Sequence, residues 1–334
     1  MTDDIIIRAK PRLITRRTLG KLAAPTVFAA AMAPGLAFAK GKRLAYITPG
    51  LDLPYWRTLS NGIAAEAKKH GASSVTYDSH NSAQTQLTNA QDAIAKNVDG
   101  IILSPTDTST APSVLAAAAR ARIPVVIADI GTSGGEYLSF VISDNRNGAY
   151  GIGKVLATEL KATGRKQNTV GLVTISLARQ NGKDRTAGFM QAMDEAGIKR
   201  VALSQMQTYT ADETFKFVQD MLTAHPEMDG LFVETDEPTI GALRAIRAAH
   251  RQKTMKVAAF DGIPEFIKMI EDGTIVGSGM QQPYLFGTEA AKALFQHFAG
   301  QTPPKRIEIP IIVVDKSNVA KEAPIVRKTT FGLS

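Results

Sequence analysis

The chain has 334 residues, of which 44% are hydrophobic and 21% are charged, which excludes disordered, collagenous and coiled-coil chains. It contains no cysteine, so disulfides, thiolate metal sites and a cysteine nucleophile are excluded as well. The formal net charge is +8, but half of this surplus lies in the first 39 residues, and no later run of Lys or Arg could follow a phosphate backbone. Nucleic acid is therefore not an expected partner.

The first 39 residues have the pattern of an export signal. Arg16 and Arg17 precede an apolar stretch over 22–36, which is too short to span a bilayer, and residues 37–39 (Ala-Phe-Ala) have the small-x-small form of a signal-peptidase site. The paired arginines resemble a twin-arginine signal, and an ordinary secretory signal that contains two arginines is the alternative. Either signal predicts a mature chain that begins after residue 39 and a periplasmic location.

From residue 43 onward, short β-branched runs alternate with amphipathic stretches. The expected strands cover 44–48, 74–77, 100–103, 125–128, 140–142, 169–174, 201–205, 230–233, 256–259 and 275–279. The expected helices cover 55–69, 84–96, 111–120, 148–162, 184–195, 213–224 and 237–249. Alternating helices and apolar strands are typical of parallel sheets that are covered by helices on both faces. The sequence therefore predicts an α/β protein with doubly wound parallel sheets.

The segments that follow the expected strands are the candidate ligand-binding segments, because open parallel sheets bind ligands outside the carboxyl ends of their strands. In chain order they are 52–56, 78–81, 104–107, 129–130, 181–185, 209, 234–236, 261–262 and 281–283. They are rich in carboxylate, amide and aromatic side chains and poor in pairs of a nucleophile and a base. This composition favours binding over catalysis.

The order and spacing of these segments resemble the periplasmic sugar-binding proteins of the ribose-binding type, the solute receptors of ABC importers. The matching segments are 78–81, 90–92, 105–107, 123–125, 143–145, 222–226, 236–237, 241–245 and 260–262. The resemblance covers nearly all of the mature chain and implies a type I periplasmic binding protein fold, in which a three-segment hinge joins two lobes. Lobe one would comprise residues 42–142 and 282–308, and lobe two residues 144–281 and 310–334.

The resemblance also implies which side chains hold a sugar. Two aromatic rings would stack on its apolar faces, namely Tyr55 or Trp56 from lobe one and Tyr209 from lobe two. Asp129 and Asp261 match the carboxylates that accept hydrogen bonds from the ring hydroxyls. The structural alternatives are a core anchor for Trp56 and helix N-caps for the two aspartates.

Three further polar residues complete the implied binding set. Gln281 matches a ligand amide in a crossing segment, Lys183 falls where the ribose receptor has a ligand arginine, and Arg185 matches a basic residue nearby. A hinge glutamine exposed to solvent and a solvated helix start are the alternatives for these positions. Because Lys183 and Arg185 are two residues apart, the sequence does not decide which of them contacts the ligand.

The sequence departs from the ribose-binding pattern at three positions. Leu53, Ile130 and Thr235 stand where the ribose receptor has an asparagine, an arginine and an asparagine. An apolar wall cannot satisfy a hydroxyl that points at it. We therefore expect a neutral sugar or polyol with one less-hydroxylated face, such as a deoxysugar, to be preferred over ribose. The alternative is that a shifted backbone or an ordered water replaces the lost donors.

Other functions fit the sequence less well. The five histidines are scattered, and there is neither a Gly-x-Ser-x-Gly elbow nor a P-loop, so we expect no catalytic activity, no cofactor and no metal. A regulator of the lac-repressor type would need a helix-turn-helix in place of the export signal. A periplasmic sensory subunit that presents a solute to a membrane kinase or chemoreceptor would share the fold and pocket, and it stays open. The expected partners are a sugar or polyol and the permease of an ABC importer, and the expected state is a monomer.

Overall fold

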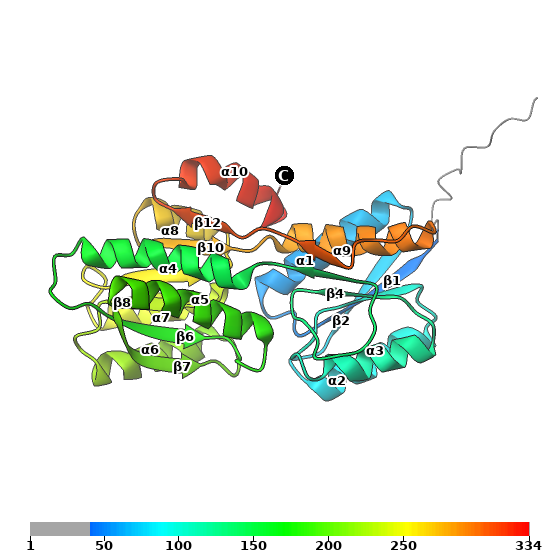
Figure 1. The fold of residues 1–334 in the computed structure, drawn as a ribbon, viewed down its shortest axis with the longest axis horizontal. Helices are drawn as coiled ribbons and strands as arrows, with labels where there is room; N and C mark the ends of the chain where they lie inside the picture. The colour runs from blue at the N-terminus through cyan, green and yellow to red at the C-terminus, as the bar shows by residue number, and fades with distance from the viewer. Residues whose placement is uncertain (1–40, 334) are drawn as a thin grey trace, which may run out of the picture. The chain divides into compact units, whose positions relative to one another are not determined.

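The computed structural model describes residues 41–333, whose strands form two six-stranded sheets (Figure 1). The first sheet has the order β11-β5-β4-β3-β1-β2 and is parallel throughout. Its strands are β1 (Arg43–Thr48), β2 (Ser73–Asp78), β3 (Gly100–Leu103), β4 (Val125–Ala128), β5 (Ser139–Ile142) and β11 (Arg306–Glu308). These strands form the sheet of lobe one.

The second sheet, that of lobe two, has the order β12-β10-β9-β8-β6-β7. It is parallel except for its edge strand β12, which pairs antiparallel with β10. Its strands are β6 (Thr169–Thr174), β7 (Lys199–Gln205), β8 (Gly230–Val233), β9 (Lys256–Phe260), β10 (Gly277–Met280) and β12 (Ile312–Asp315). Both sheets therefore have the doubly wound organisation that the sequence predicts.

Helices pack in pairs on both faces of each sheet (Figure 1). On the first sheet the pairs are α1 (Pro54–Lys69) with α9 (Pro283–Phe298), and α2 (Ala83–Ala95) with α3 (Ala111–Arg120). On the second sheet they are α4 (Asn145–Lys161) with α5 (Gln180–Ala196), and α6 (Ala211–Ala224) with α7 (Asp236–Ala248). Two further helices, α8 (Glu265–Glu271) and α10 (Val319–Thr329), contact each other beside the second sheet.

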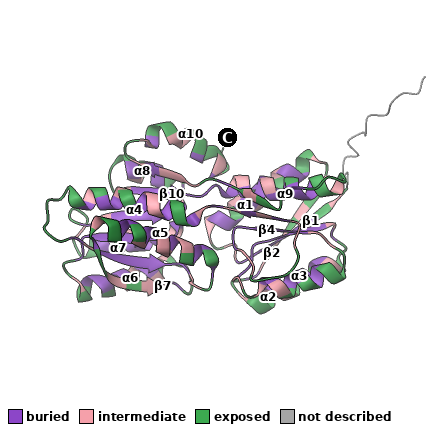
Figure 2. Ribbon diagram, viewed as in Figure 1, coloured by how far each residue is buried: buried purple, intermediate pink, exposed green. Residues whose placement is uncertain are grey.

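Strand β1 shows how each sheet forms two cores. Successive residues of a strand point to opposite faces, so Leu44 and Tyr46 join the core under α1 and α9, whereas Ala45 and Ile47 join the core under α2 and α3. All four residues are completely buried. Figure 2 shows the sheets as buried layers between helices whose outer faces are exposed. Burial on both faces explains why the strands are apolar runs without alternation.

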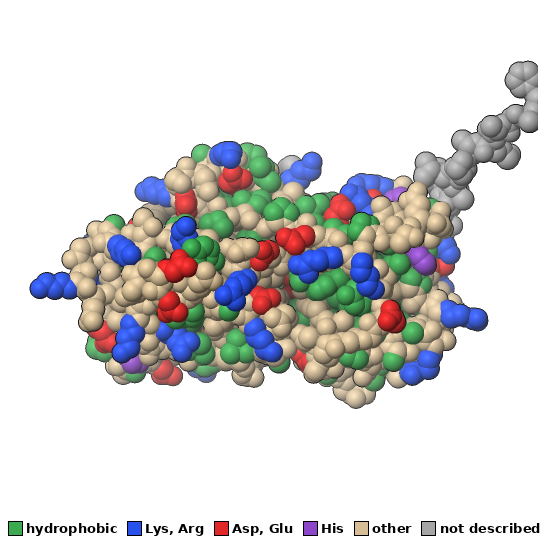
Figure 3. Space-filling model, viewed as in Figure 1, with side chains coloured by type: hydrophobic (Ala, Val, Ile, Leu, Met, Phe, Trp, Pro, Cys, Tyr) green, Lys and Arg blue, Asp and Glu red, His purple; other side chains and the backbone are tan. Residues whose placement is uncertain are grey.

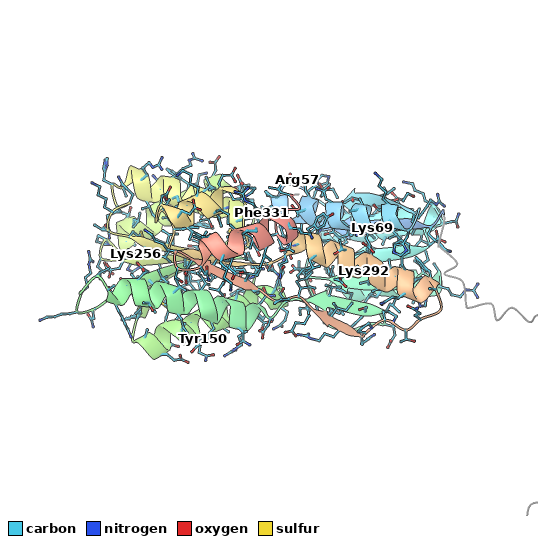
Figure 4. All side chains as sticks on the ribbon, turned by 90° about the horizontal axis from the view of Figure 1, so that it is seen from above. Arg57, Lys69, Tyr150, Lys256, Lys292 and Phe331 are labelled. Atoms are coloured by element: carbon cyan, nitrogen blue, oxygen red, sulfur yellow. The ribbon has the colours of Figure 1, made fainter. Side chains whose placement is uncertain are left out.

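The chain crosses between the two sheets three times. It crosses from β5 to α4 through Ser143 and Asp144, from β10 to α9 through Gln281 and Gln282, and from β11 to β12 through residues 309–311. At the end of the chain, a Cβ atom on Gly332 would lie only 2.8 Å from the ring of Tyr284 at the start of α9. Phe331, the residue before Gly332, is labelled in Figure 4, and helices α9 and α10 are in contact with each other. The α/β class and the two-lobed fold are thus confirmed.

The ten predicted strands are all present, with small shifts at their ends. Strands β11 and β12 were not predicted, because they are short edge strands whose pairing partners lie far away in sequence. Helix α5 begins at Gln180, four residues before its predicted start. No side chain caps its N-terminus, so the usual sequence signal for a helix start is absent.

The predicted export signal lies outside the described residues. Within residues 41–333, no helix has the length and apolar character that a membrane span requires. On the face shown in Figure 3, basic and acidic side chains are interspersed. The charge on that face is therefore mixed in sign.

Candidate functional site

A small cavity lies where the carboxyl ends of both sheets meet. We call it the central cavity. It is lined by Leu53, Tyr55, Trp56, Asp129, Ile175, Arg179, Asn181, Arg185, Tyr209, Thr235, Asp261 and Gln281. Eight of the ten site residues predicted from the sequence are in this lining. The cavity thus collects residues from both lobes and from one crossing segment, as expected for an open-sheet site.

Asp129 is buried at the end of β4 and accepts three hydrogen bonds from uncharged donors. Oδ1 accepts from the Tyr55 hydroxyl at 3.0 Å and from Gln281 Nε2 at 2.9 Å. Oδ2 accepts from Asn181 Nδ2 at 3.1 Å, across the boundary between the lobes. Since a carboxylate offers about four acceptor positions, one remains for a ligand hydroxyl.

Asp261 is buried at the end of β9 and pairs with Arg185. Arg185 Nη1 donates to Asp261 Oδ2 at 3.0 Å and Nη2 donates to Oδ1 at 3.3 Å, a bidentate ion pair. The remaining N–H groups of Arg185 donate to Asn145 Oδ1 at 2.8 Å, to the backbone oxygen of Glu234 at 2.6 Å, and to Gln281 Oε1. Every donor of Arg185 is therefore used within the protein.

Gln281 connects the two carboxylates. Its amide nitrogen donates to Asp129 of lobe one, while its amide oxygen accepts from Arg185, the partner of Asp261 in lobe two. The side chain is completely buried and sits in the second crossing segment.

Three cavity residues have left-handed backbone conformations. The φ angles are 68° at Asp129, 58° at Tyr209 and 59° at Asp261. Asp tolerates this region, but a bulky residue such as Tyr seldom adopts it. Tyr209 is held there by Glu213, whose Oε2 accepts from the backbone nitrogens of Thr208 and Tyr209, both at 2.9 Å. Such strained conformations concentrate at functional sites.

The aromatic side chains line the cavity from both lobes. The rings of Tyr55 and Trp56 meet edge to face at 4.8 Å. The Tyr209 hydroxyl accepts from the backbone nitrogen of Ser176 at 3.3 Å, and the Arg179 guanidinium lies over the Tyr209 ring at 4.8 Å. One face of Tyr209 is therefore covered by a cation.

Two open grooves adjoin the central cavity. The outer groove is lined by Pro49, Gly50, Asp52, Leu53, Trp56, His80, Asn81, Arg179, Gln207, Thr208 and Tyr209. The hinge groove lies beside the first crossing segment and has Asp129 and Asn181 in common with the cavity. The central cavity is thus bordered on one side by Arg179 and Tyr209 and on the other by Asp129 and Asn181.

Two predicted site residues do not line the central cavity. Ile130 is completely buried in the core under α1 and α9, because it points away from the side on which its neighbour Asp129 lies. Lys183 is exposed and lines the hinge groove. The basic residues in the cavity lining are Arg185 and Arg179.

The predicted binding set includes neither Arg179 nor Asn181, although Asn181 falls in the candidate segment 181–185. Both lie at the start of α5, where Arg179 Nε donates to the backbone oxygen of Thr106 at 2.8 Å and Nη2 donates to Asn81 Oδ1 at 2.8 Å. Between them, the Gln180 nitrogen donates to Thr108 Oγ1 at 3.2 Å. Three consecutive residues of lobe two thus contact lobe one. If the sequence had predicted that α5 begins at residue 180, these residues would have been expected beside the central cavity.

Burial changes the protonation of the carboxylates in this region. Burial raises the pKa of Asp261 to about 7, although Arg185 opposes the shift. Burial also raises the pKa of Glu234 to about 8. Glu234 lies behind the cavity, where it accepts from the Ile175 nitrogen at 3.1 Å and from Thr186 Oγ1 at 2.7 Å. Burial therefore favours the protonated form of both carboxyl groups.

Residues 44–302 match the family described as periplasmic binding protein domain. The chain belongs to this family. Periplasmic binding proteins of known specificity are among its relatives. The ribose import binding protein of Escherichia coli (strain K12) is 29% identical over 273 residues, which cover 82% of this chain and 90% of that protein. The D-ribose/D-allose-binding protein of Pseudomonas aeruginosa is 29% identical over 297 aligned residues, covering 81% of this chain and 88% of that protein.

Solved structures of periplasmic binding proteins share the fold. A glucose-galactose binding protein from Geobacillus stearothermophilus superposes with a TM-score of 0.74 and 25% identity, over 84% of this chain and 99% of that one. A periplasmic solute-binding protein of an ABC transporter from Actinobacillus succinogenes 130z, solved with bound D-allose, superposes with a TM-score of 0.77 and 24% identity, over 84% and 99% of the two chains. The family is therefore one of solute receptors and not of enzymes.

Proposed function

We propose that this protein is the periplasmic substrate-binding subunit of an ABC importer and that it captures a sugar or a polyol in the central cavity. The observation that carries this proposal is the pairing of Asp129 from lobe one with Asp261 from lobe two around one cavity, linked through Gln281 and Arg185. Buried carboxylates with free acceptor positions suit vicinal hydroxyls. The sugar-specific relatives support the same class of ligand.

The proposed contacts divide into three kinds. The rings of Tyr55, Trp56 and Tyr209 would contact the apolar faces of the ligand. Asp129 and Asp261 would accept from its hydroxyls. Arg185, Thr235 and Gln281 also line the cavity, but Arg185 would act chiefly by fixing Asp261 and Gln281, because its own donors are already used.

The further parts of the proposal concern export and delivery. Residues 1–39 would direct the chain to the periplasm, where a monomer would bind its solute and pass it to a membrane permease. The sheet membership of the strands supports lobe boundaries at 42–142 with 282–308, and at 144–281 with 310–334. The crossing segments between them would act as the hinge, so that a ligand touching both lobes would favour a closed state.

A thermal-shift screen of the protein against sugars and polyols tests this function. A ligand at 100 times its dissociation constant adds about 2.7 kcal/mol to the free energy of unfolding, which gives a clear rise in Tm. We expect at least one sugar or sugar derivative to raise Tm and to bind with a one-to-one stoichiometry by calorimetry. The absence of any such ligand from a broad carbohydrate panel would contradict the proposal.

A further inference from the structure

Arg179 is a buried cation at the boundary between the central cavity and the outer groove. It precedes α5, its side chain lines both spaces, and only 5% of the residue is exposed. Its guanidinium reaches from lobe two to Thr106 and Asn81 of lobe one. The positive charge of Arg179 therefore interacts electrostatically with any ligand bound in the central cavity.

The donors of Arg179 are less completely used than those of Arg185. Nε and Nη2 of Arg179 each have an acceptor, but Nη1 has no hydrogen-bond partner among residues 41–333. The hydroxyl of the neighbouring Tyr209 accepts from Ser176 and likewise donates to no acceptor in the described part of the chain. This boundary therefore offers several N–H and O–H hydrogens without acceptors.

Apolar side chains complete the same boundary. The other two residues that line both the cavity and the outer groove are Leu53 and Trp56. Neither side chain can accept a hydrogen bond, so this apolar part of the boundary offers a ligand hydroxyl no acceptor for its own hydrogen. A group with several acceptors and no hydrogens to donate fits better.

The charge of Arg179 is also not neutralised by a neighbouring carboxylate. Its acceptors are a backbone oxygen and an amide oxygen, whereas Arg185 is paired with Asp261. The carboxylates that influence it from farther away, Asp129 and Asp107, are engaged elsewhere, Asp129 in the cavity and Asp107 with Ser109 and Thr110. Burial accordingly lowers the pKa of Arg179. A buried cation without a counterion is unfavourable, and an anionic ligand group would supply the missing partner.

We propose that Arg179 and Tyr209 form a carboxylate-binding subsite at this boundary and that the ligand of this protein is a polyhydroxylated acid, such as an aldonic or uronic acid. The inference rests on the proposed function. The carboxylate accepts from Arg179 Nη1 and the Tyr209 hydroxyl, while the hydroxyls at the other end of the ligand donate to Asp129 and Asp261. This proposal differs from the neutral ligand expected from the sequence, because that expectation did not consider Arg179.

Matched pairs of a sugar and its acid test the subsite on the full chain. Suitable pairs are D-galactose with D-galacturonate, D-glucose with D-gluconate and D-ribose with D-ribonate, with sodium chloride added to equalise ionic strength. We expect at least one acid to bind at least tenfold more tightly than its neutral partner by calorimetry. Tighter binding of the neutral member in every pair that binds would overturn the inference and leave the proposed function standing, whereas no binding in any pair and none across the broad carbohydrate panel would overturn both.

Three variants separate ligand recognition from contact between the lobes. Arg179→Gln should weaken binding of the acid at least tenfold and bring its affinity close to that of the neutral sugar, and Arg179→Lys should restore part of the difference, because it keeps the charge. Tyr209→Phe should weaken binding of the acid several-fold. Arg244→Gln, which alters an exposed arginine paired with Asp212, is the matched control and should change nothing. An equal loss for the acid and the neutral sugar in Arg179→Gln, with an unchanged circular dichroism spectrum, would show that Arg179 only joins the lobes.

Discussion

Asp129 and Asp261 occupy equivalent places at the ends of β4 and β9, yet their surroundings differ. Asp129 accepts from three uncharged donors, while Asp261 is paired with a buried arginine. A carboxylate without a salt bridge attracts a ligand hydroxyl more strongly than one paired with an arginine. We therefore expect Asp129 to bind ligand hydroxyls more strongly than Asp261 does. Asp261 depends on Arg185, and the two residues act as a unit.

Replacing either carboxylate should weaken ligand binding, and Asp261→Ala should also lower Tm, because it leaves the buried Arg185 without its ion-pair partner. We expect Asp129→Ala and Asp261→Ala each to weaken binding at least tenfold by calorimetry, because hydrogen bonds to charged groups contribute about 1.5–3 kcal/mol. Asp212→Ala, in which an exposed carboxylate is removed, is the control. Normal affinity in either cavity variant would mean that the aspartate serves the fold and not the ligand.

Glu234 makes stability depend on pH. Burial raises its pKa from 4.5 to about 8, so between these pH values the folded chain holds a proton that the unfolded chain has released. The free energy of unfolding should therefore fall as pH rises from about 5 to 8 and should change less above that range. We expect Tm to follow this trend and Glu234→Gln to flatten it. An unchanged slope in Glu234→Gln would assign the trend to other groups.

At the scale of elements, the first turn of α5 has two roles. It follows β6 closely, so that Arg179 and Asn181 reach the cavity, and it brings three consecutive residues against lobe one. The position of helix α5 depends on its close packing against helix α4. A Cβ atom at Gly188 would lie 2.0 Å from the backbone oxygen of Arg146, so only glycine allows the two helices to approach this closely.

Gly188→Ala should therefore destabilise the protein. The added methyl group would collide with the α4 backbone and force the helices apart, and overpacking of this kind costs about 1–3 kcal/mol. We expect a lower Tm together with weaker ligand binding, since α5 also positions Arg179 and Arg185. Gly134→Ala is a suitable control, because a Cβ atom there meets nothing within 4 Å. Equal Tm values for the two variants would contradict the packing argument.

At the scale of the whole molecule, the two lobes are connected by three crossing segments and by hydrogen bonds across the central cavity. The contacts across the cavity are few and specific, namely Arg179 with Thr106 and Asn81, Gln180 with Thr108, and Asn181 with Asp129. A handful of hydrogen bonds exchanged with water contributes little net stability. The equilibrium between open and closed lobes should therefore respond to a ligand that contacts both.

Small-angle scattering measures this response directly. We expect the radius of gyration to be smaller at saturating ligand than without ligand, because the ligand stabilises the closed arrangement about the three crossings. A variant with weakened binding, such as Asp129→Ala, should require a higher ligand concentration to reach the same decrease in the radius of gyration. A radius that stays constant at saturation would argue against the hinge.

The alternation of strands and helices, the parallel sheets and most of the cavity lining could be predicted from the sequence. Apolar strand runs and helix periodicity are local patterns, and the rule that ligands bind at the carboxyl ends of strands converts them into site residues such as Asp129 and Asp261. The edge strands β11 and β12 escaped prediction because they break the alternation of strands and helices, with no helix between them, and because their pairing partners are distant in sequence.

Only the tertiary structure decided which basic residue borders the cavity. Successive residues of a helix point about 100° apart, so Lys183 and Arg185, two positions apart in α5, face nearly opposite sides; Arg185 lines the cavity and Lys183 is exposed. Arg179 precedes the helix and lines the cavity from there. Likewise, Ile130 faces the core while its neighbour Asp129 faces the cavity. Whether the N–H groups of an arginine are free to bind a ligand depends on acceptors from distant segments. Arg185, for example, donates to Asn145, Glu234, Asp261 and Gln281. A linear sequence does not contain these distances, and the chemistry of the site depends on them.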